Sequence, residues 1–155
     1  MVSFQHVHEK DAPKLHNIMQ FYIYEFSKYI PEIKLEDNGS YKPFDLEKYW
    51  TNNNFHAYFI ENKGELIGFA LVESAAFPSP NTIQEYFILA KYQGCGFGKE
   101  GAKQLFSMFP GAWEITQIEK NKPAQAFWRR LINEVSGGHF SEEYTDGVYI
   151  QKFNT

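Results

Sequence analysis

A glycine-rich segment in the middle of the chain, Gln93–Gly98 (Gln-Gly-Cys-Gly-Phe-Gly), lies between an apolar run and a helical run. The apolar run, Ile83–Leu89, predicts a strand, and the helical run begins near Lys99. Glycine adopts the positive φ values of a tight turn, and a helix start leaves N–H groups unpaired with a partial positive charge. A strand, a glycine-rich turn and a helix in this order are typical of a backbone that wraps a pyrophosphate. We therefore predict a site for a nucleotide-bearing cofactor.

The glycine spacing distinguishes between the known phosphate-binding motifs. A P-loop needs Gly-x-x-x-x-Gly-Lys-Ser/Thr, and no serine or threonine follows Lys99. The triplet Gly96, Gly98 and Gly101 matches the dinucleotide fingerprint Gly-x-Gly-x-x-Gly. That fingerprint belongs to the first strand of a fold that needs several more βαβ units, and only about fifty residues remain. A tight turn or a packing requirement stays open as the alternative reason for the glycines.

The pattern that fits best is Gln-x-x-Gly-x-Gly, formed by Gln93, Gly96 and Gly98. It resembles the Gln/Arg-x-x-Gly-x-Gly/Ala signature of the acyl-CoA pyrophosphate site in the GNAT superfamily of N-acetyltransferases. Upstream, Glu85–Tyr92 looks like the family's fourth strand running into this loop. Downstream, Asn121–Trp128 resembles the family's Asn-x-x-Ala-x-x-Phe/Leu-Tyr segment, which flanks the pantetheine arm.

Turn residues divide the rest of the chain into alternating elements. The expected strands are Ser3–His8, Phe55–Glu61, Glu65–Glu73, Ile83–Leu89, Trp113–Glu119, His139–Tyr144 and Val148–Phe153, and the expected helices run from Asp11 to Pro31, near Asp45–Trp50, over Gly98–Phe109 and over Pro123–Val135. The order β-α-α-β-β-β-α-β-α-β-β is that of the acyl-CoA N-acyltransferase fold, an α/β (α+β) architecture. The resemblance implies one GNAT-like domain over residues 1–155, with a mixed central sheet whose fourth and fifth strands splay apart.

The resemblance also implies where the cofactor, acetyl-CoA, would bind. The fourth strand would offer backbone groups to the pantetheine, the glycine loop would hold the pyrophosphate, and the helix after the fifth strand would flank the arm. The predicted cofactor-binding residues are Phe87, Ile88, Leu89, Gln93, Gly94, Cys95, Gly96, Phe97, Gly98, Lys99, Asn121, Phe127 and Trp128.

Acyl transfer to an amine requires that the amine lose a proton. An alkylamine with a pKa near 10.4 is mostly charged at neutral pH, and neutralising it costs about 4.6 kcal/mol. Glu85 is the predicted general base, because strand alternation places it with Phe87 and Leu89 on one face where neighbouring rings could desolvate its carboxylate. Its position relative to the loop also matches a base found in some family members. The alternative is a solvated carboxylate on a free strand face.

The chain departs from the family pattern at the general acid. Many relatives have a tyrosine seven residues after the asparagine, where it protonates the leaving thiolate, and this chain has Trp128 there. Indole cannot act as that acid, so Tyr86, Tyr24, Tyr92 or water are open substitutes. Trp128 itself is expected in the core or in a wall of the cofactor slot.

Cysteine and histidine are the two other residue types that could supply reactive groups. Cys95 lies near a helix start, which would lower the pKa of its thiol, but direct transfer needs no enzyme nucleophile. His6 and His8 share a strand face at a spacing suited to a metal, but no third ligand is in view, so we predict no metal site.

Composition limits the partners. The net charge of -4 disfavours nucleic acid as a ligand. No run of about 18 apolar residues exists, the first residues lack a signal-peptide pattern and there is one cysteine, so we expect a cytoplasmic protein away from membranes.

The acceptor is expected to be a primary amine of a small molecule or a protein, and the sequence does not identify it further. Phe21, Tyr24 and Tyr29 either line an acceptor pocket or cover the edge of the sheet. A homodimer is left open. The alternative functions are a non-catalytic acyl-CoA binding or sensing module of the same fold, and a nucleotide-binding protein that uses the loop for another phosphate.

Overall fold

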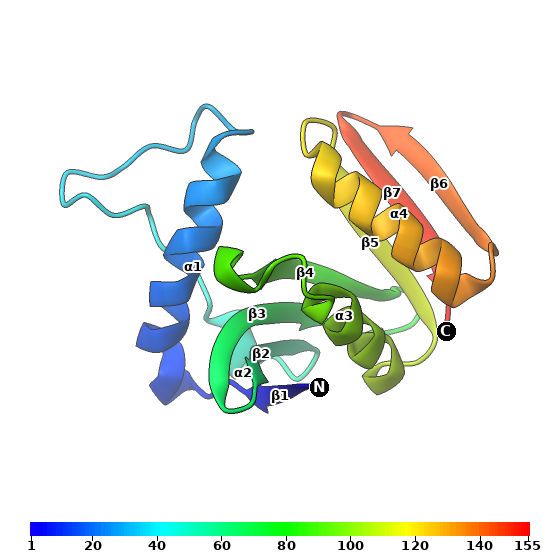
Figure 1. The fold of residues 1–155 in the computed structure, drawn as a ribbon, viewed down its shortest axis with the longest axis horizontal. Coiled ribbons are helices and arrows are strands. Elements are labelled where there is room, and N and C mark those ends of the chain that lie inside the picture. Colours follow the sequence, from blue (N-terminus) through cyan, green and yellow to red (C-terminus); the bar gives the residue numbers. More distant parts are fainter.

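The computed structural model describes residues 1–155 as a seven-stranded mixed sheet with helices packed on both faces (Figure 1). The strand order is β1-β2-β3-β4-β5-β7-β6, and only β4 and β5 are parallel neighbours. The strands are β1 (Val2–His6), β2 (Phe55–Asn62), β3 (Glu65–Glu73), β4 (Asn81–Ile88), β5 (Ala112–Ile118), β6 (Phe140–Thr145) and β7 (Val148–Asn154). The helices are α1 (Ala12–Ser27), α2 (Lys48–Thr51), α3 (Phe97–Met108) and α4 (Lys122–Ser136).

The predicted order of elements is confirmed, with shifts at several boundaries. The fourth strand begins at Asn81 and ends at Ile88, so Leu89 already lies past it. Helix α2 is shorter than expected, because the Asp45 side chain accepts a hydrogen bond from the Glu47 N–H (3.1 Å) and holds a turn ahead of the helix. None of the helices combines the length and the apolar character that a membrane span requires.

Each face of the sheet has its own hydrophobic core. The expected stripe of α1, which includes Leu15, Met19 and Tyr22, is buried against β2, β3 and β4. On the opposite face, α3 and α4 pack over a second core that contains Trp113 and Ile132. Alternate residues of β3 and β4 supply the two cores, so each strand presents one set of side chains to α1 and another to α3 and α4.

Strands β4 and β5 diverge after a short contact, as expected. They pair only at Asn81 with Trp113 and at Thr82 with Glu114. The register between β3 and β4 shifts beyond this point and leaves Gln84 without a partner, which is a β-bulge. A bulge bends the strand that contains it, and this one directs β4 away from β5.

The end at which β4 and β5 still pair is fixed by the buried side chain of Asn81. Its Oδ1 accepts a hydrogen bond from the Ala75 N–H (2.7 Å), and its Nδ2 donates to the carbonyls of Phe109 and Ala112 (3.1 Å each). One amide thus joins the β3–β4 loop, the end of α3 and the start of β5. From there the strands open toward the space between α1 and α4 (Figure 1).

Candidate active site

A cleft of about 770 Å³ occupies the opening between β4 and β5. Its walls come from α1, both strands, the start of α3 and the inner side of α4. Most of the predicted site residues line it: Glu85, Phe87, Ile88, Gln93, Gly94, Gly96, Gly98, Lys99, Asn121, Phe127 and Trp128. Leu89, Cys95 and Phe97 do not line it, and Cys95 is exposed.

The glycine loop at one end of the cleft has the backbone of an anion site. Gly94 (φ 79°) and Gly96 (φ 84°) are left-handed, and an added Cβ at either would meet no atom within 4 Å. Gly96 caps α3, whose first bond runs from the Glu100 N–H to the Gly96 carbonyl (3.0 Å). The N–H groups ahead of Glu100 therefore have no acceptor within the helix, and the space in front of the loop is open.

Two side chains fix the shape of this loop. The Gln93 amide nitrogen donates to the Ile88 carbonyl (2.8 Å), which folds the loop back onto the end of β4. The Tyr86 hydroxyl donates to the Gly98 carbonyl (2.7 Å), which ties the same strand to the first turn of α3. The glutamine of the signature thus shapes the loop.

Hydrogen-bond alternation shows which backbone groups of β4 face the cleft. The Leu89 N–H donates to the carbonyl of Ile67 in β3 (2.8 Å), so this N–H is not free for a ligand. In an antiparallel pair every second residue bonds to the partner strand, so Phe87, opposite Phe69, also bonds toward β3. Tyr86 and Ile88 direct their N–H and C=O groups the other way, toward β5.

Glu85 lies on the α1 side of β4, and its carboxylate accepts a hydrogen bond from the Tyr22 hydroxyl. Burial raises the pKa of Glu85 to about 7, against the opposing effects of the Tyr22 hydrogen bond and the Lys48 charge, which lower it. Burial, followed by the Glu85 charge, in turn raises the pKa of Tyr22. A carboxylate largely removed from water, with a pKa near neutrality, favours the general base over the solvated surface group.

Of the tyrosines considered as general acids, only Tyr86 lines the cleft. Tyr24 is 63% exposed and Tyr92 bonds Glu65 on the surface, so both lie outside the cleft. Tyr86 lines the cleft, but its proton is donated to the Gly98 carbonyl, and burial raises its pKa. Trp128 is buried in the core against the ring of Tyr86, with the ring centroids 5.6 Å apart, and also forms part of the cleft wall.

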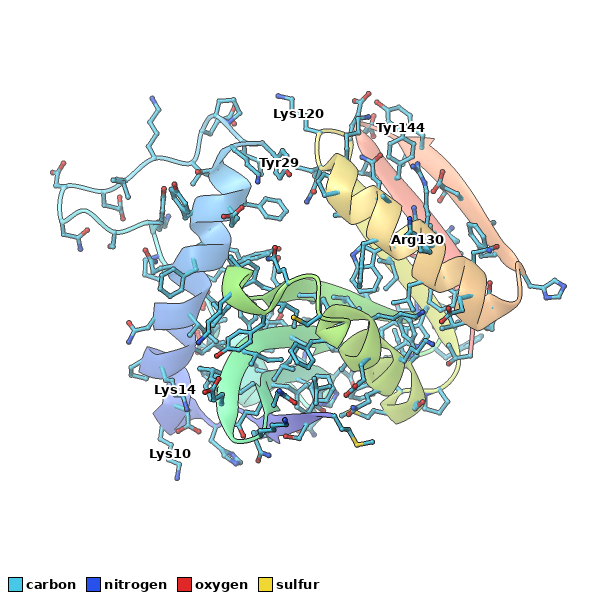
Figure 2. The ribbon with its side chains drawn as sticks, in the orientation of Figure 1. Lys10, Lys14, Tyr29, Lys120, Arg130 and Tyr144 are labelled. Atoms are coloured by element: carbon cyan, nitrogen blue, oxygen red, sulfur yellow. The ribbon has the colours of Figure 1, made fainter.

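The glycine-loop end of the cleft contains charged side chains. Lys99 pairs with Glu134 of α4 (2.8 Å), which also pairs with Lys103 (2.5 Å), and these two hydrogen bonds lower the pKa of Glu134 to about 2. Arg130, an exposed residue of α4, lines the same side of the cleft (Figure 2). Asn121 caps α4 by accepting a hydrogen bond from the Ala124 N–H (3.2 Å).

Sequence reasoning missed several residues of the opposite end. The cleft is also lined by Glu25 and Phe26 of α1, by Lys28 just past the end of that helix, and by Thr116 and Gln117 of β5. The spacing of Phe26 predicts burial, the other four residues are polar, and no local signal marks any of them as part of a site.

Of the three aromatic residues expected to line an acceptor pocket or to cover the sheet edge, one lines the cleft and two do not. Tyr29 lines the cleft just past α1, facing the turn that bears Lys120 (Figure 2). Phe21 and Tyr24 do not line it and are mostly exposed. The rings of His6 and His8 lie 4.7 Å apart, and no group of three metal-ligating side chains includes them.

The sequence matches the model of the acetyltransferase (GNAT) family over residues 18–132. A search of curated proteins finds no match. Among solved structures, an acetyltransferase from Thermus thermophilus is similar, with 18% identity, a TM-score of 0.73 and coverage of 100% of this chain and 97% of that chain. A ribosomal-protein alanine N-acetyltransferase from Escherichia coli has 15% identity and a TM-score of 0.64, covering 99% and 94% of the two chains. The PaiA N-acetyltransferase from Thermoplasma acidophilum, solved with coenzyme A, has 13% identity and a TM-score of 0.65, covering 100% and 99%.

Proposed function

Because the chain belongs to the acetyltransferase (GNAT) family, we propose that it binds acetyl-CoA in the cleft between β4 and β5 and transfers the acetyl group directly to a primary amine. The observation that supports this most strongly is that one cleft joins the open glycine loop at one end to a half-buried carboxylate at the other. The first element suits a pyrophosphate, and the second suits the proton of an amine.

The residues at the loop end fit the cofactor. The unpaired N–H groups at the start of α3 would hold the pyrophosphate, with Lys99 and Arg130 adding positive charge. The backbone groups of Tyr86 and the N–H of Ile88 face the gap and would pair with the amides of the pantetheine arm. Phe127 and Trp128 would form the apolar side of the slot.

Glu85 would accept the proton that the acceptor ammonium must lose. The freed amine then forms a C–N bond to the acetyl carbon, the C–S bond breaks with its electron pair leaving on the CoA thiolate, and the nitrogen's remaining excess proton passes through water to that thiolate. With a pKa of about 7, Glu85 is ionised in about half of the molecules at neutral pH and can still retain the proton that it takes. Tyr22 would orient the carboxylate through its hydrogen bond.

Two of the tyrosines that line the cleft have hydroxyl protons already donated, Tyr22 to Glu85 and Tyr86 to the Gly98 carbonyl. Because the Tyr86 hydroxyl is committed to the Gly98 carbonyl, we assign Tyr86 to holding the loop, and water protonates the departing thiolate. The single exposed cysteine suits a reducing compartment, and we place the reaction in the cytoplasm.

Two measurements on the same protein test this function. Thermal unfolding with CoA, ATP or NAD identifies the ligand of the loop, since a ligand at 100 times its Kd adds about 2.7 kcal/mol of stability. Thioester cleavage with acetyl-CoA and a panel of amines then measures transfer. CoA binding without turnover on any amine would indicate a non-catalytic binding or sensing module, and stabilisation by ATP or NAD alone would indicate a different nucleotide site.

A further inference from the structure

Three aromatic rings form a track along the acceptor side of the cleft. Tyr22, Phe26 and Tyr29 follow one another along and just past α1, and all three line the cleft. Their ring centroids are 5.1 Å and 6.2 Å apart in turn. The track begins at the hydroxyl that bonds Glu85 and ends at the open side of the molecule, where Tyr29 is labelled in Figure 2. An apolar group attached to an amine at Glu85 would therefore lie against these rings.

Two of the three carboxylates that line the cleft are paired with the chain's own cations. Glu25 pairs with Lys28 (3.1 Å), and the Lys28 ammonium also lies 5.3 Å from the centroid of the Tyr29 ring. Glu134 is paired twice, as described above. Glu85 is the one cleft carboxylate that has no lysine or arginine within 4 Å.

We propose, on the basis of the proposed function, that the acceptor is a small primary monoamine with an aryl or alkyl body, and not a polyamine. The reactive nitrogen meets Glu85, and the body covers the track of Tyr22, Phe26 and Tyr29. A second ammonium on the same body would lose water beside these rings without gaining a free carboxylate. It would also meet the positive charge of Lys28, which already occupies the carboxylate and ring at the end of the track.

Matched amines test this class. Pentylamine and cadaverine have the same five-carbon chain, and cadaverine adds only a second ammonium. We expect kcat/KM for pentylamine to exceed that for cadaverine by about tenfold or more, which is the discrimination that a small apolar site provides. Phenethylamine should behave like pentylamine. Equal or faster acetylation of cadaverine would overturn the assignment, as would acetylation of peptide N-termini with none of these small amines.

Two variants test whether the rings of the track bind the body of the amine. Tyr29→Ala should lower kcat/KM for pentylamine by about tenfold, mainly by raising KM, with a smaller loss for ethylamine, which is too short to reach that ring. Phe21→Ala is the matched control, because Phe21 is an exposed aromatic residue of α1 that does not line the cleft. Equal losses for the two amines, or equal effects of the two variants, would overturn the role of the track.

A third variant should reverse the charge selectivity. Lys28→Gln leaves Glu25 without its cation, so a carboxylate becomes free near the end of the track. Cadaverine should then gain relative to pentylamine, and an unchanged ratio would count against the charge argument. CoA binding, measured in parallel, distinguishes a failure of the proposed function from a failure of the proposed acceptor class. A protein that binds CoA but acetylates no amine refutes the proposed function, whereas one that prefers cadaverine retains that function and refutes only the acceptor class.

Discussion

The two ends of the cleft are built in different ways. The proposed cofactor end, at the glycine loop, is formed by backbone within a short stretch, as in the bond from the Gln93 side chain to Ile88, five residues away. The acceptor end depends on side chains from distant elements, since Tyr22 and Glu85 are separated by 63 positions. A backbone site needs particular φ values and is therefore visible as glycines, whereas a side-chain site exists only once the packing is complete. The two ends should accordingly fail in different ways when they are altered.

The largest expected effect is at the acceptor end. Glu85→Gln should lower kcat by about 10² to 10⁴, the usual contribution of a general base, and should remove the rise in rate with pH near 7. Affinity for CoA should change little, because Glu85 is not part of the glycine loop. A pH–rate profile and a CoA titration check both statements, and a mutant that keeps the limb near pH 7 would exclude Glu85 as the base.

The same substitution should stabilise the fold at high pH. Between pH 4.5 and about 7 the unfolded chain releases the Glu85 proton while the native state keeps it, so native stability falls as pH rises. At 1.36 kcal/mol per pH unit this cost reaches about 3 kcal/mol above pH 7 and is absent below pH 4.5.

Glutamine stays neutral and avoids this cost. Denaturant unfolding should show Glu85→Gln about 3 kcal/mol more stable than the parent at pH 8 and equally stable at pH 4. Equal stability at both pH values would mean that the Glu85 carboxylate is well solvated.

At the cofactor end, Gly96→Val should weaken CoA binding by about tenfold or more, because a branched side chain is strained at φ 84° and occupies the open space before the loop. Gly147→Val is the matched control, since Gly147 has a similar φ (81°) and equally open surroundings but lies in the β6–β7 hairpin. Both variants should lose about 1–2 kcal/mol of stability from backbone strain. Only Gly96→Val should lose CoA affinity, and parallel losses would contradict the placement of the cofactor.

A smaller effect is expected from Tyr22→Phe. Its hydroxyl lowers the pKa of Glu85, so removing it should move the rising limb of the pH–rate profile to higher pH. A hydrogen bond to a charged group contributes about 1.5–3 kcal/mol, which bounds the change. Phe26→Leu, at the next ring of the track, should leave the limb in place. A shift to lower pH in Tyr22→Phe would contradict the assigned hydrogen bond.

The smallest effect is expected at Cys95. It is exposed and does not line the cleft, and its thiol lies 3.8 Å from the Gln93 carbonyl. Cys95→Ala should change kcat/KM by no more than about twofold, as is usual for an exposed residue. Steady-state kinetics check this, and a loss of activity with formation of an acetylated thiol in the parent protein would indicate a ping-pong route.

The contrast between the two ends also explains what the sequence could predict. Gly94 and Gly96 announce the loop because no other residue adopts their φ values easily, and Pro123 and Gly137 mark the limits of α4. The order of elements followed from such turn signals and from hydrophobic periodicity.

The acceptor end left no comparable signal. Tyr22 fits the apolar stripe of α1, so its spacing predicts burial and not a bond to a carboxylate of β4. The bulge at Gln84 has no sequence marker either, and it changes which residues of β4 face β5. We therefore propose that the backbone groups for the cofactor come from Tyr86 and Ile88 rather than from Phe87 and Leu89.

The three hydrogen bonds of Asn81 have a wider consequence for this architecture. Through them one carboxamide connects the two halves of the sheet, β1 to β4 on one side and β5 to β7 on the other. The separation of β4 and β5 is then set by a residue that does not line the cleft. A change of residue there would alter which molecules enter while every reacting group kept its own chemistry.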